Sequence, residues 1–283
     1  MKRRLTLIAV LVVSTTMLAQ RTPLKPGGIN VYSPADDVKL GQQVAQQAEK
    51  ELTLVANREI TAYVAALGQR LVTKSPNENK FPFTFKVVDE RSINAFALPG
   101  GPIYVHRGAL EAADNEAQIA GVIGHEIAHV ILRHGTNQAS KGSLAGGATS
   151  ILGGLLGNSR VGQIASLGGS FGANMVLLKY SRSAESDADL MGTQILYDSG
   201  YDPRAMAEFF DKLAKEHKGS SIEQFFSNHP IPENRVAKVN AEIKKLGPQL
   251  ANPKLTTPEF ERTKKMLLAM PDPKPKAKPA AKG

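Results

Sequence analysis

The segment GHEIAHVILRH, from Gly124 to His134, constrains this chain more than any other part of its sequence. It holds three of the six histidines in the chain. On an α-helix each residue advances by about 100°, so His125 and His129 lie on one face, one turn apart. Two imidazole rings placed in this way can bind the same metal ion.

Glu126 completes an H-E-x-x-H pattern in the same segment. The helix turns this carboxylate about 100° away from His125, close enough to reach a water molecule on the metal. In this chemistry zinc lowers the pKa of the water towards about 7, and the glutamate accepts a proton as the water attacks a peptide carbonyl. The alternative is that the histidines are hydrogen-bonded core residues. Apolar periodicity from Asn115 to His134, with Asp114 as the expected N-cap, favours the helix and the metal site.

A catalytic zinc site needs a third protein ligand. The chain has no cysteine, so a thiolate is excluded. His134 follows His129 by five residues, which is about 140° round a continuous helix, and we expect it to face elsewhere. The later segment SRSAESDADLMG offers Glu185 as the ligand, with Asp189 one turn further on to hold an imidazole N–H. A solvated helix face is the alternative for this acidic segment.

The pattern of the remaining chain predicts an α+β fold, mostly helical with a small β-sheet. Helical periodicity covers residues 35–72 in two pieces, 115–134, 181–199, 202–217 and a last stretch that ends near Leu246. FPFTFKVVDE alternates as a half-buried strand does, and LPGGP separates AFAL from IYVH as a hairpin or a sharp bend would. One of these two strands is a candidate edge for pairing with an extended substrate, the alternative being an interior strand.

The ends of the chain have a different character. Residues 1–20 combine a cationic start with an apolar run and predict a signal peptide or an uncleaved anchor. We assign residues 21–250 to a zinc metalloprotease domain, in which the glycine-rich apolar segment 141–178 is a lid or a membrane-contacting segment. Residues 251–283 form a C-terminal extension with a disordered Pro/Lys tail.

The formal net charge of +9 is concentrated at the two ends of the chain. Three positive charges lie in residues 2–4, and a net three lie beyond Pro271. The residues between them carry no basic stripe with interleaved aromatic side chains, and the chain has no tryptophan. We therefore expect no nucleic-acid partner.

HEIAH, AESDAD and NHPIPENR together resemble the gluzincin zinc metalloproteases of the HtpX / CAAX prenyl protease / BepA-like family. The resemblance runs from about Asp37 to Leu246 and includes NAFALPGGPIYVHRGAL. It implies a zincin-type metalloprotease domain with one catalytic Zn²⁺. By the family pattern, His125, His129 and Glu185 are the zinc ligands and Glu126 is the general base. Asp189 is then the residue that supports a ligand histidine.

The H-P-x-x-x-x-R element of this family matches His229, Pro230 and Arg235. It implies a histidine and an arginine near the substrate carbonyl, where they stabilise the developing oxyanion. In BepA-like members the equivalent histidine can instead close the site by taking the open position on zinc, so both roles stay open for His229. We expect no counterpart of the TPR domain of BepA-like members.

These observations predict an exported, periplasmic zinc metalloendopeptidase, with association to the membrane or the outer membrane left open. Its expected substrates are misfolded or unassembled envelope proteins. A zinc-stabilised periplasmic chaperone or assembly factor with latent proteolysis is the alternative.

Overall fold

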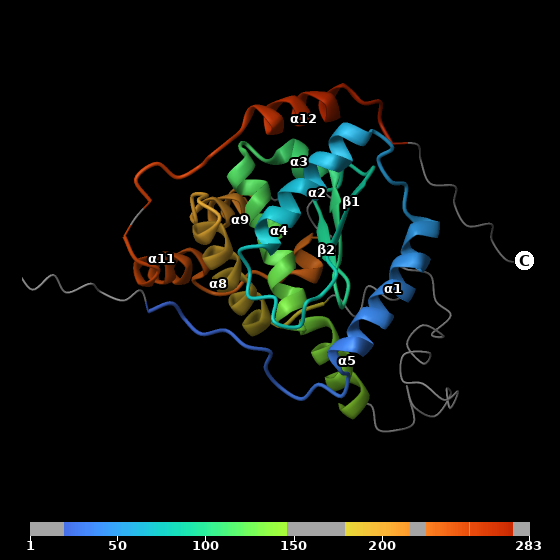
Figure 1. The fold of residues 1–283 in the computed structure, drawn as a ribbon, viewed down its shortest axis with the longest axis vertical. Helices are drawn as coiled ribbons and strands as arrows, with labels where there is room; N and C mark the ends of the chain where they lie inside the picture. The colour runs from blue at the N-terminus through green and yellow to red at the C-terminus, as the bar shows by residue number, and fades with distance from the viewer. Residues whose placement is uncertain (1–19, 146–178, 216–224, 249, 274–283) are drawn as a thin grey trace, which may run out of the picture.

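A computed structural model describes residues 20–145, 179–215, 225–248 and 250–273 of the chain. Helices surround a three-stranded sheet, with helix α4 at the centre (Figure 1). This confirms the predicted α+β class with a mostly helical body. The predictions for the signal peptide or anchor, for most of the glycine-rich segment and for the end of the Pro/Lys tail fall on residues outside the described ranges.

Two N-terminal helices precede the sheet. Helix α1 spans Pro34–Glu51 and begins with a capping box between Ser33 and Asp36. Helix α2 spans Arg58–Val72, and its N-cap Asn57 accepts hydrogen bonds from two backbone N–H groups of the first turn. The first predicted helix continued beyond Glu51, but Leu54 instead forms a β-bridge with Val88.

The sheet contains β1 (Thr84–Val88), β2 (Ala95–Ala97) and β3 (Pro102–His106), in the order β1-β3-β2. Strand β3 pairs in parallel with β1 and antiparallel with β2, which confirms the bend predicted at LPGGP. Gly100 has a φ of +71°, and a Cβ there would lie 2.4 Å from Cα of Val38, so the turn requires glycine. Within the described sheet β2 is an edge strand, whereas β3 lies inside it.

The remaining helices pack on this sheet and on each other. Their bounds are α3 Arg107–Ala112, α4 Glu116–Ile131, α5 His134–Ala145, α8 Arg182–Asp198, α9 Ala205–Lys215, α11 Arg235–Lys245 and α12 Pro258–Ala269. Every residue of α4 is buried, because α8 and α9 cover it on one side and the sheet and α2 on the other (Figure 1). The main hydrophobic core therefore surrounds the helix that carries the opening motif.

Two details of α4 differ from the sequence prediction. Its N-cap is Asn115, whose side chain accepts a hydrogen bond from the backbone N–H of Gln118, whereas Asp114 binds Lys212 with its carboxylate. The helix also ends at Ile131 and not at His134, because Arg133 adopts a left-handed backbone conformation with a φ of 57°. Helix α3 was not predicted.

The chain segments at both ends of the described body lie against it. Residues 20–33 run in extended form past α11 and α8 to α5 (Figure 1). Helix α12 packs on α2 and α3, and its side chains Phe260 and Leu267 belong to the main core. None of the helices in the described ranges is both long and apolar enough to cross a membrane.

Candidate metal centre

The crossing of α4 and α8 brings the two halves of the predicted site together. Gly124 on α4 faces Gly192 on α8, and a Cβ added to Gly192 would lie 3.2 Å from the backbone nitrogen of His125. The absence of a side chain at Gly192 lets the two backbones approach closely. As a result, residues from two segments about 55 positions apart in the sequence share one buried site.

Four buried side chains, His125, His129, Glu185 and His229, each offer one ligand atom, and these atoms lie within 4.8 Å of one another. Nε2 of His129 is 3.0 Å from Nε2 of His125, and Oε1 of Glu185 is 3.4 Å from Nε2 of His129. Nδ1 of His229 lies 3.4 Å from Nε2 of His125 and 3.2 Å from Oε1 of Glu185. The structure therefore places the three predicted ligands and His229 around a single point.

Glu126 lies beside this group and is completely buried. Its Oε1 is 3.6 Å from Nε2 of His229, and the backbone N–H of Ala97 in β2 approaches the carboxylate without the geometry of a regular hydrogen bond. Neither oxygen has a hydrogen-bond partner within the described ranges. Burial raises the pKa of this carboxyl group, although the nearby charges of His229 and His125 lower it. A buried carboxylate without a partner is free to accept a proton from a bound water molecule.

Asp189 and Arg235 support the two ligand elements from behind. Oδ1 of Asp189 is 3.2 Å from Nδ1 of His125, the ring nitrogen that faces away from the ligand group, although the two are not aligned as a regular hydrogen bond. Arg235 donates from Nε to Oδ2 of Asp189 at 2.7 Å and from a terminal nitrogen to Glu185 at 3.5 Å. Its guanidinium carbon also lies 4.5 Å from the centre of the Phe210 ring. These contacts favour a role for Arg235 in holding the two carboxylates.

His134 does not face away from the site as the continuous-helix argument expected. Because α4 ends before it, the ring turns back, and its Nδ1 lies 2.9 Å from Nδ1 of His129. Burial lowers the pKa of His134 to about 4. It is not part of the group of convergent ligand atoms among the described residues.

Two aromatic residues that the sequence analysis did not single out cover the ligand group. The ring of Tyr180 stacks on His129 with the centroids 3.8 Å apart, and the ring of Phe225 stacks on His229 at 4.8 Å. The backbone N–H of Tyr180 donates to the carbonyl of Asn228, which joins the start of the α8 segment to the His229 loop. The signal for Tyr180 in the sequence was weak, since it is one aromatic residue before the Ser181 cap.

Burial and the neighbouring charged groups shift the pKa values of the side chains in the ligand group. Burial opposes protonation of His125, but Asp189 and Glu185 outweigh burial and raise its pKa to about 10. Burial lowers the pKa of His129 well below its usual value. Burial alone would raise the pKa of Glu185, yet the three histidines around it hold the pKa well below its usual value. The site thus contains an ionised carboxylate surrounded by imidazoles.

This donor set fits zinc. Imidazole nitrogens and a carboxylate oxygen are common ligands of Zn²⁺, and catalytic zinc sites use three of them. Nothing in the group offers the six or more oxygen ligands that Ca²⁺ prefers. His125, His129 and Glu185 can therefore hold the ion, and His229 is placed where a fourth ligand would be.

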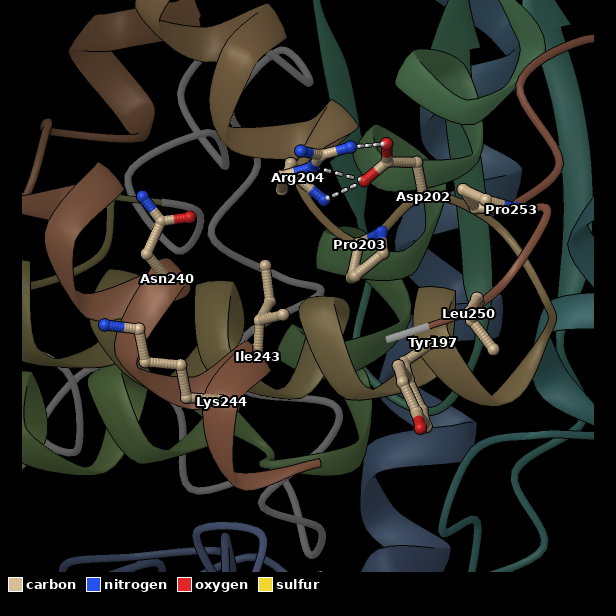
Figure 2. Close-up of a pocket in the computed structure, with 9 residues that line it drawn as sticks. All are labelled: Tyr197, Asp202, Pro203, Arg204, Asn240, Ile243, Lys244, Leu250 and Pro253. Carbon is tan, nitrogen blue, oxygen red and sulfur yellow. Dashed lines mark hydrogen bonds and ion pairs between the residues drawn. The ribbon is translucent and has the colours of Figure 1, made fainter. Parts of the chain in front are cut away.

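A separate cavity of about 320 Å³ opens between the end of α8, the start of α9 and α11 (Figure 2). Tyr197, Pro203 and Ile243 form part of its apolar lining. At its rim Arg204 forms an ion pair with Asp202 at 2.6 Å. None of the residues that line this cavity belongs to the metal-binding group, so we assign it no part in the site.

Comparison with known proteins agrees with this geometry. Residues 58–243 match the model of "Peptidase family M48", which is more than half of the chain. The chain belongs to peptidase family M48. This confirms the predicted resemblance, and membership in M48 together with the donor set makes zinc the expected metal.

Three named proteases illustrate what this M48 chain is similar to. It is 30% identical over 227 residues to the β-barrel assembly-enhancing protease of Escherichia coli K12, covering 78% of this chain and 46% of that protein. It is 31% identical to the metalloprotease LoiP of the same organism, covering 74% of this chain and 81% of the relative. The mitochondrial metalloendopeptidase OMA1 of Arabidopsis thaliana is 32% identical over 53% of this chain and 29% of its own length. The chain thus spans about half the length of the first of these relatives.

Proposed function

We propose that this chain is an exported zinc metalloendopeptidase that cleaves misfolded or unassembled proteins of the cell envelope. The observation that carries the proposal is the convergence of His125, His129 and Glu185 on one point, beside the unpartnered carboxylate of Glu126. The names of the relatives, which include a β-barrel assembly-enhancing protease and two other metalloproteases, support the reaction and the envelope setting. The cationic and apolar start of the sequence supports export.

Each residue of the site has its own role in peptide hydrolysis. Zinc, when bound, supplies Lewis acidity and a water molecule of lowered pKa. Glu126 accepts the proton of the attacking water and passes it to the leaving amine, for which its raised pKa suits it. Asp189 lies 3.2 Å from Nδ1 of His125 and can accept its proton, and Arg235 fixes Asp189 and Glu185. The edge strand β2, whose Ala97 approaches Glu126, can pair with an extended substrate beside the base.

The position of His229 supports a closed resting state. Its Nδ1 reaches the same point as the three proposed ligands, and Phe225 stacks on a face of its ring. A histidine in this place occupies the position that a catalytic zinc must keep open for water or substrate. We therefore favour the inhibitory role of His229 over the oxyanion role, and we expect substrate or a partner to displace it.

The proposal is tested with four purified proteins: the wild type, His229→Ala, Glu126→Gln and the double variant. Casein serves as an unfolded substrate, with and without a zinc chelator. We expect His229→Ala to cleave casein faster than the wild type. The double variant should lose this activity by about 10²–10⁴-fold, because the base is missing. The chelator should abolish cleavage.

Two outcomes would contradict the proposal. Cleavage by the double variant at the rate of His229→Ala would show that Glu126 is not the base. If all four proteins bind zinc and none cleaves casein, the zinc-stabilised chaperone or assembly factor becomes the better interpretation. Suppression of casein aggregation by the inactive proteins would support that alternative directly.

A further inference from the structure

Each of the two ligand histidines has a ring nitrogen that faces away from the ligand group. For His125 this is Nδ1, and the carboxylate of Asp189 lies 3.2 Å from it. For His129 it is also Nδ1, and its neighbour at 2.9 Å is Nδ1 of His134. Histidines that bind metals usually donate this second N–H to a neighbouring acceptor, which fixes the tautomer and the angle of the ring. The acceptor for His129 is thus another histidine.

The fold produces this contact by interrupting the helix. Helix α4 ends at Ile131, and the left-handed conformation of Arg133, with a φ of 57°, redirects the chain before α5 starts at His134. This conformation is unfavourable for arginine. Asp37 holds the guanidinium at 2.6 and 3.0 Å, and the carbonyl of Tyr32 accepts a further hydrogen bond from it at 2.6 Å. This ion pair, in which Asp37 is buried and Arg133 partly exposed, stabilises the break that brings His134 back to the site.

The chemistry of the ring decides the direction of the hydrogen bond. Nε2 of His129 points into the ligand group, 3.0 Å from Nε2 of His125. If Nε2 binds the metal through its lone pair, the neutral ring carries its proton on Nδ1. That proton must then be donated, and the only hydrogen-bond partner that the described residues place at Nδ1 is Nδ1 of His134. His134 therefore accepts with Nδ1 and carries its own proton on Nε2.

We propose that His134 is a positioning residue of the metal site, which accepts the Nδ1–H of His129 and so holds Nε2 of His129 towards the ion. This inference rests on the proposed function, in which His129 binds zinc. His134 does for His129 what Asp189 does for His125. Asp189 is negatively charged and His134 is neutral, so the two acceptors together add only one negative charge to the site.

The packing of His129 allows the hydrogen bond to be tested separately from the shape of the site. The face of the His129 ring is held by Tyr180, which stacks on it at an angle of 17°. His134 is only partly buried and contacts the edge of the same ring, with the two planes at 72°. Removal of the acceptor alone should therefore leave the rings packed and change mainly the freedom of His129 to turn or to change tautomer.

Two variants of nearly matched geometry separate the acceptor from the packing. In His134→Asn the side-chain oxygen takes the place of Nδ1 and can still accept. In His134→Leu the apolar side chain fills similar space but cannot accept. Zinc affinity is measured by competition with a chromophoric chelator, and stability is measured by urea unfolding of the metal-free proteins.

We expect His134→Leu to bind zinc about 10–100-fold more weakly than the wild type, as loss of such a partner does in other zinc sites. His134→Asn should stay close to the wild-type affinity. The two metal-free variants should unfold at similar urea concentrations. Cobalt substituted for zinc should show a changed visible absorption spectrum in His134→Leu and not in His134→Asn, because that spectrum reports ligand geometry.

The failures of the two proposals can be told apart. A wild-type protein that binds no zinc overturns the metal site itself. A wild-type protein that binds zinc tightly, with His134→Leu equal to it in affinity and in the cobalt spectrum, overturns only the role of His134. An equal loss of affinity in both variants also overturns that role, since it would mean that the ring is needed for packing and not as an acceptor.

Discussion

At the scale of single residues, Glu242 joins the N-terminal segment to the body. This carboxylate on α11 is fully buried and accepts hydrogen bonds from the backbone N–H of Thr22 at 2.8 Å and from its hydroxyl at 2.5 Å. Gln194 on α8 donates to the same carboxylate at 2.7 Å. Burial alone would raise the pKa of Glu242, but these hydrogen bonds outweigh burial and lower it below 4.5. A depressed pKa means that the ionised group stabilises the folded state.

We predict that Glu242→Gln destabilises the protein by about 1–2 kcal/mol at pH 7, because a charge-assisted acceptor becomes a neutral amide. The contribution of Glu242 is fully present above its unfolded pKa, near 4.5, and is lost as the pH falls through the lower folded value. Urea unfolding at pH 7 and at pH 3.5 should therefore show a difference between wild type and variant that shrinks in acid. A difference of the same size at both pH values would contradict this account.

At the scale of elements, the site depends on how closely α4 can approach its neighbours. Gly121 and Gly124 lie one turn apart on α4 and have different surroundings. A Cβ at Gly121 would lie 2.5 Å from Cβ and 2.8 Å from Cα of Met206 on α9. A Cβ at Gly124 would meet its nearest neighbour, the carbonyl oxygen of Gly192, at 3.7 Å, an ordinary contact. Of these two glycines, only Gly121 lies so close to the backbone of Met206 that a side chain does not fit.

We predict that Gly121→Ala is less stable than Gly124→Ala by about 1–3 kcal/mol, the usual cost of overpacking a core. Both substitutions gain the same helix propensity, up to about 1 kcal/mol, so this gain cancels in the comparison. The measurement is urea unfolding of the two metal-free variants. Equal stability would show that α9 moves away from α4 at little cost.

At the scale of the whole molecule, the segment after α11 is part of the folded body. The backbone carbonyl of Leu255 accepts a hydrogen bond at 2.8 Å from the backbone N–H of Ala117, at the start of α4. The hydroxyl of Thr257 donates to the buried carboxylate of Glu116 in the same turn. Phe260 and Leu267 of α12 are buried in the main core. The extension predicted from residue 251 therefore packs on the helix that carries the site.

We predict that a chain ending at Leu250 loses about 3–6 kcal/mol of stability, because Phe260 and Leu267 each contribute about 1.5–3 kcal/mol by their burial. A chain ending at Pro273 is the matched control, since it keeps α12 and all the contacts described above. Urea unfolding of both chains measures the difference. Unfolding at the same urea concentration would mean that α12 contributes nothing to the stability of the body.

Much of the fold followed from periodicity. The helices at 34–51, 58–72, 182–198 and 205–215 and the strand at 84–88 were predicted within a few residues, because their apolar positions repeat with the period of the element. The end of α4 was predicted wrongly. A local pattern does not reveal that Asp37, almost a hundred residues earlier, stabilises the left-handed backbone conformation of Arg133.

The sequence by itself determined the chemistry of the candidate site. The 100° step of an α-helix places His125, Glu126 and His129, and the acidic segment about 55 residues further on offers Glu185 as a third ligand, with Asp189 one turn beyond it. Only the tertiary structure decided what lies around them: Tyr180 over His129, His229 at the fourth position, Arg235 on the two carboxylates and His134 behind His129. These contacts depend on helix crossings and a broken helix, and long-range packing of this kind leaves no periodic trace in the sequence.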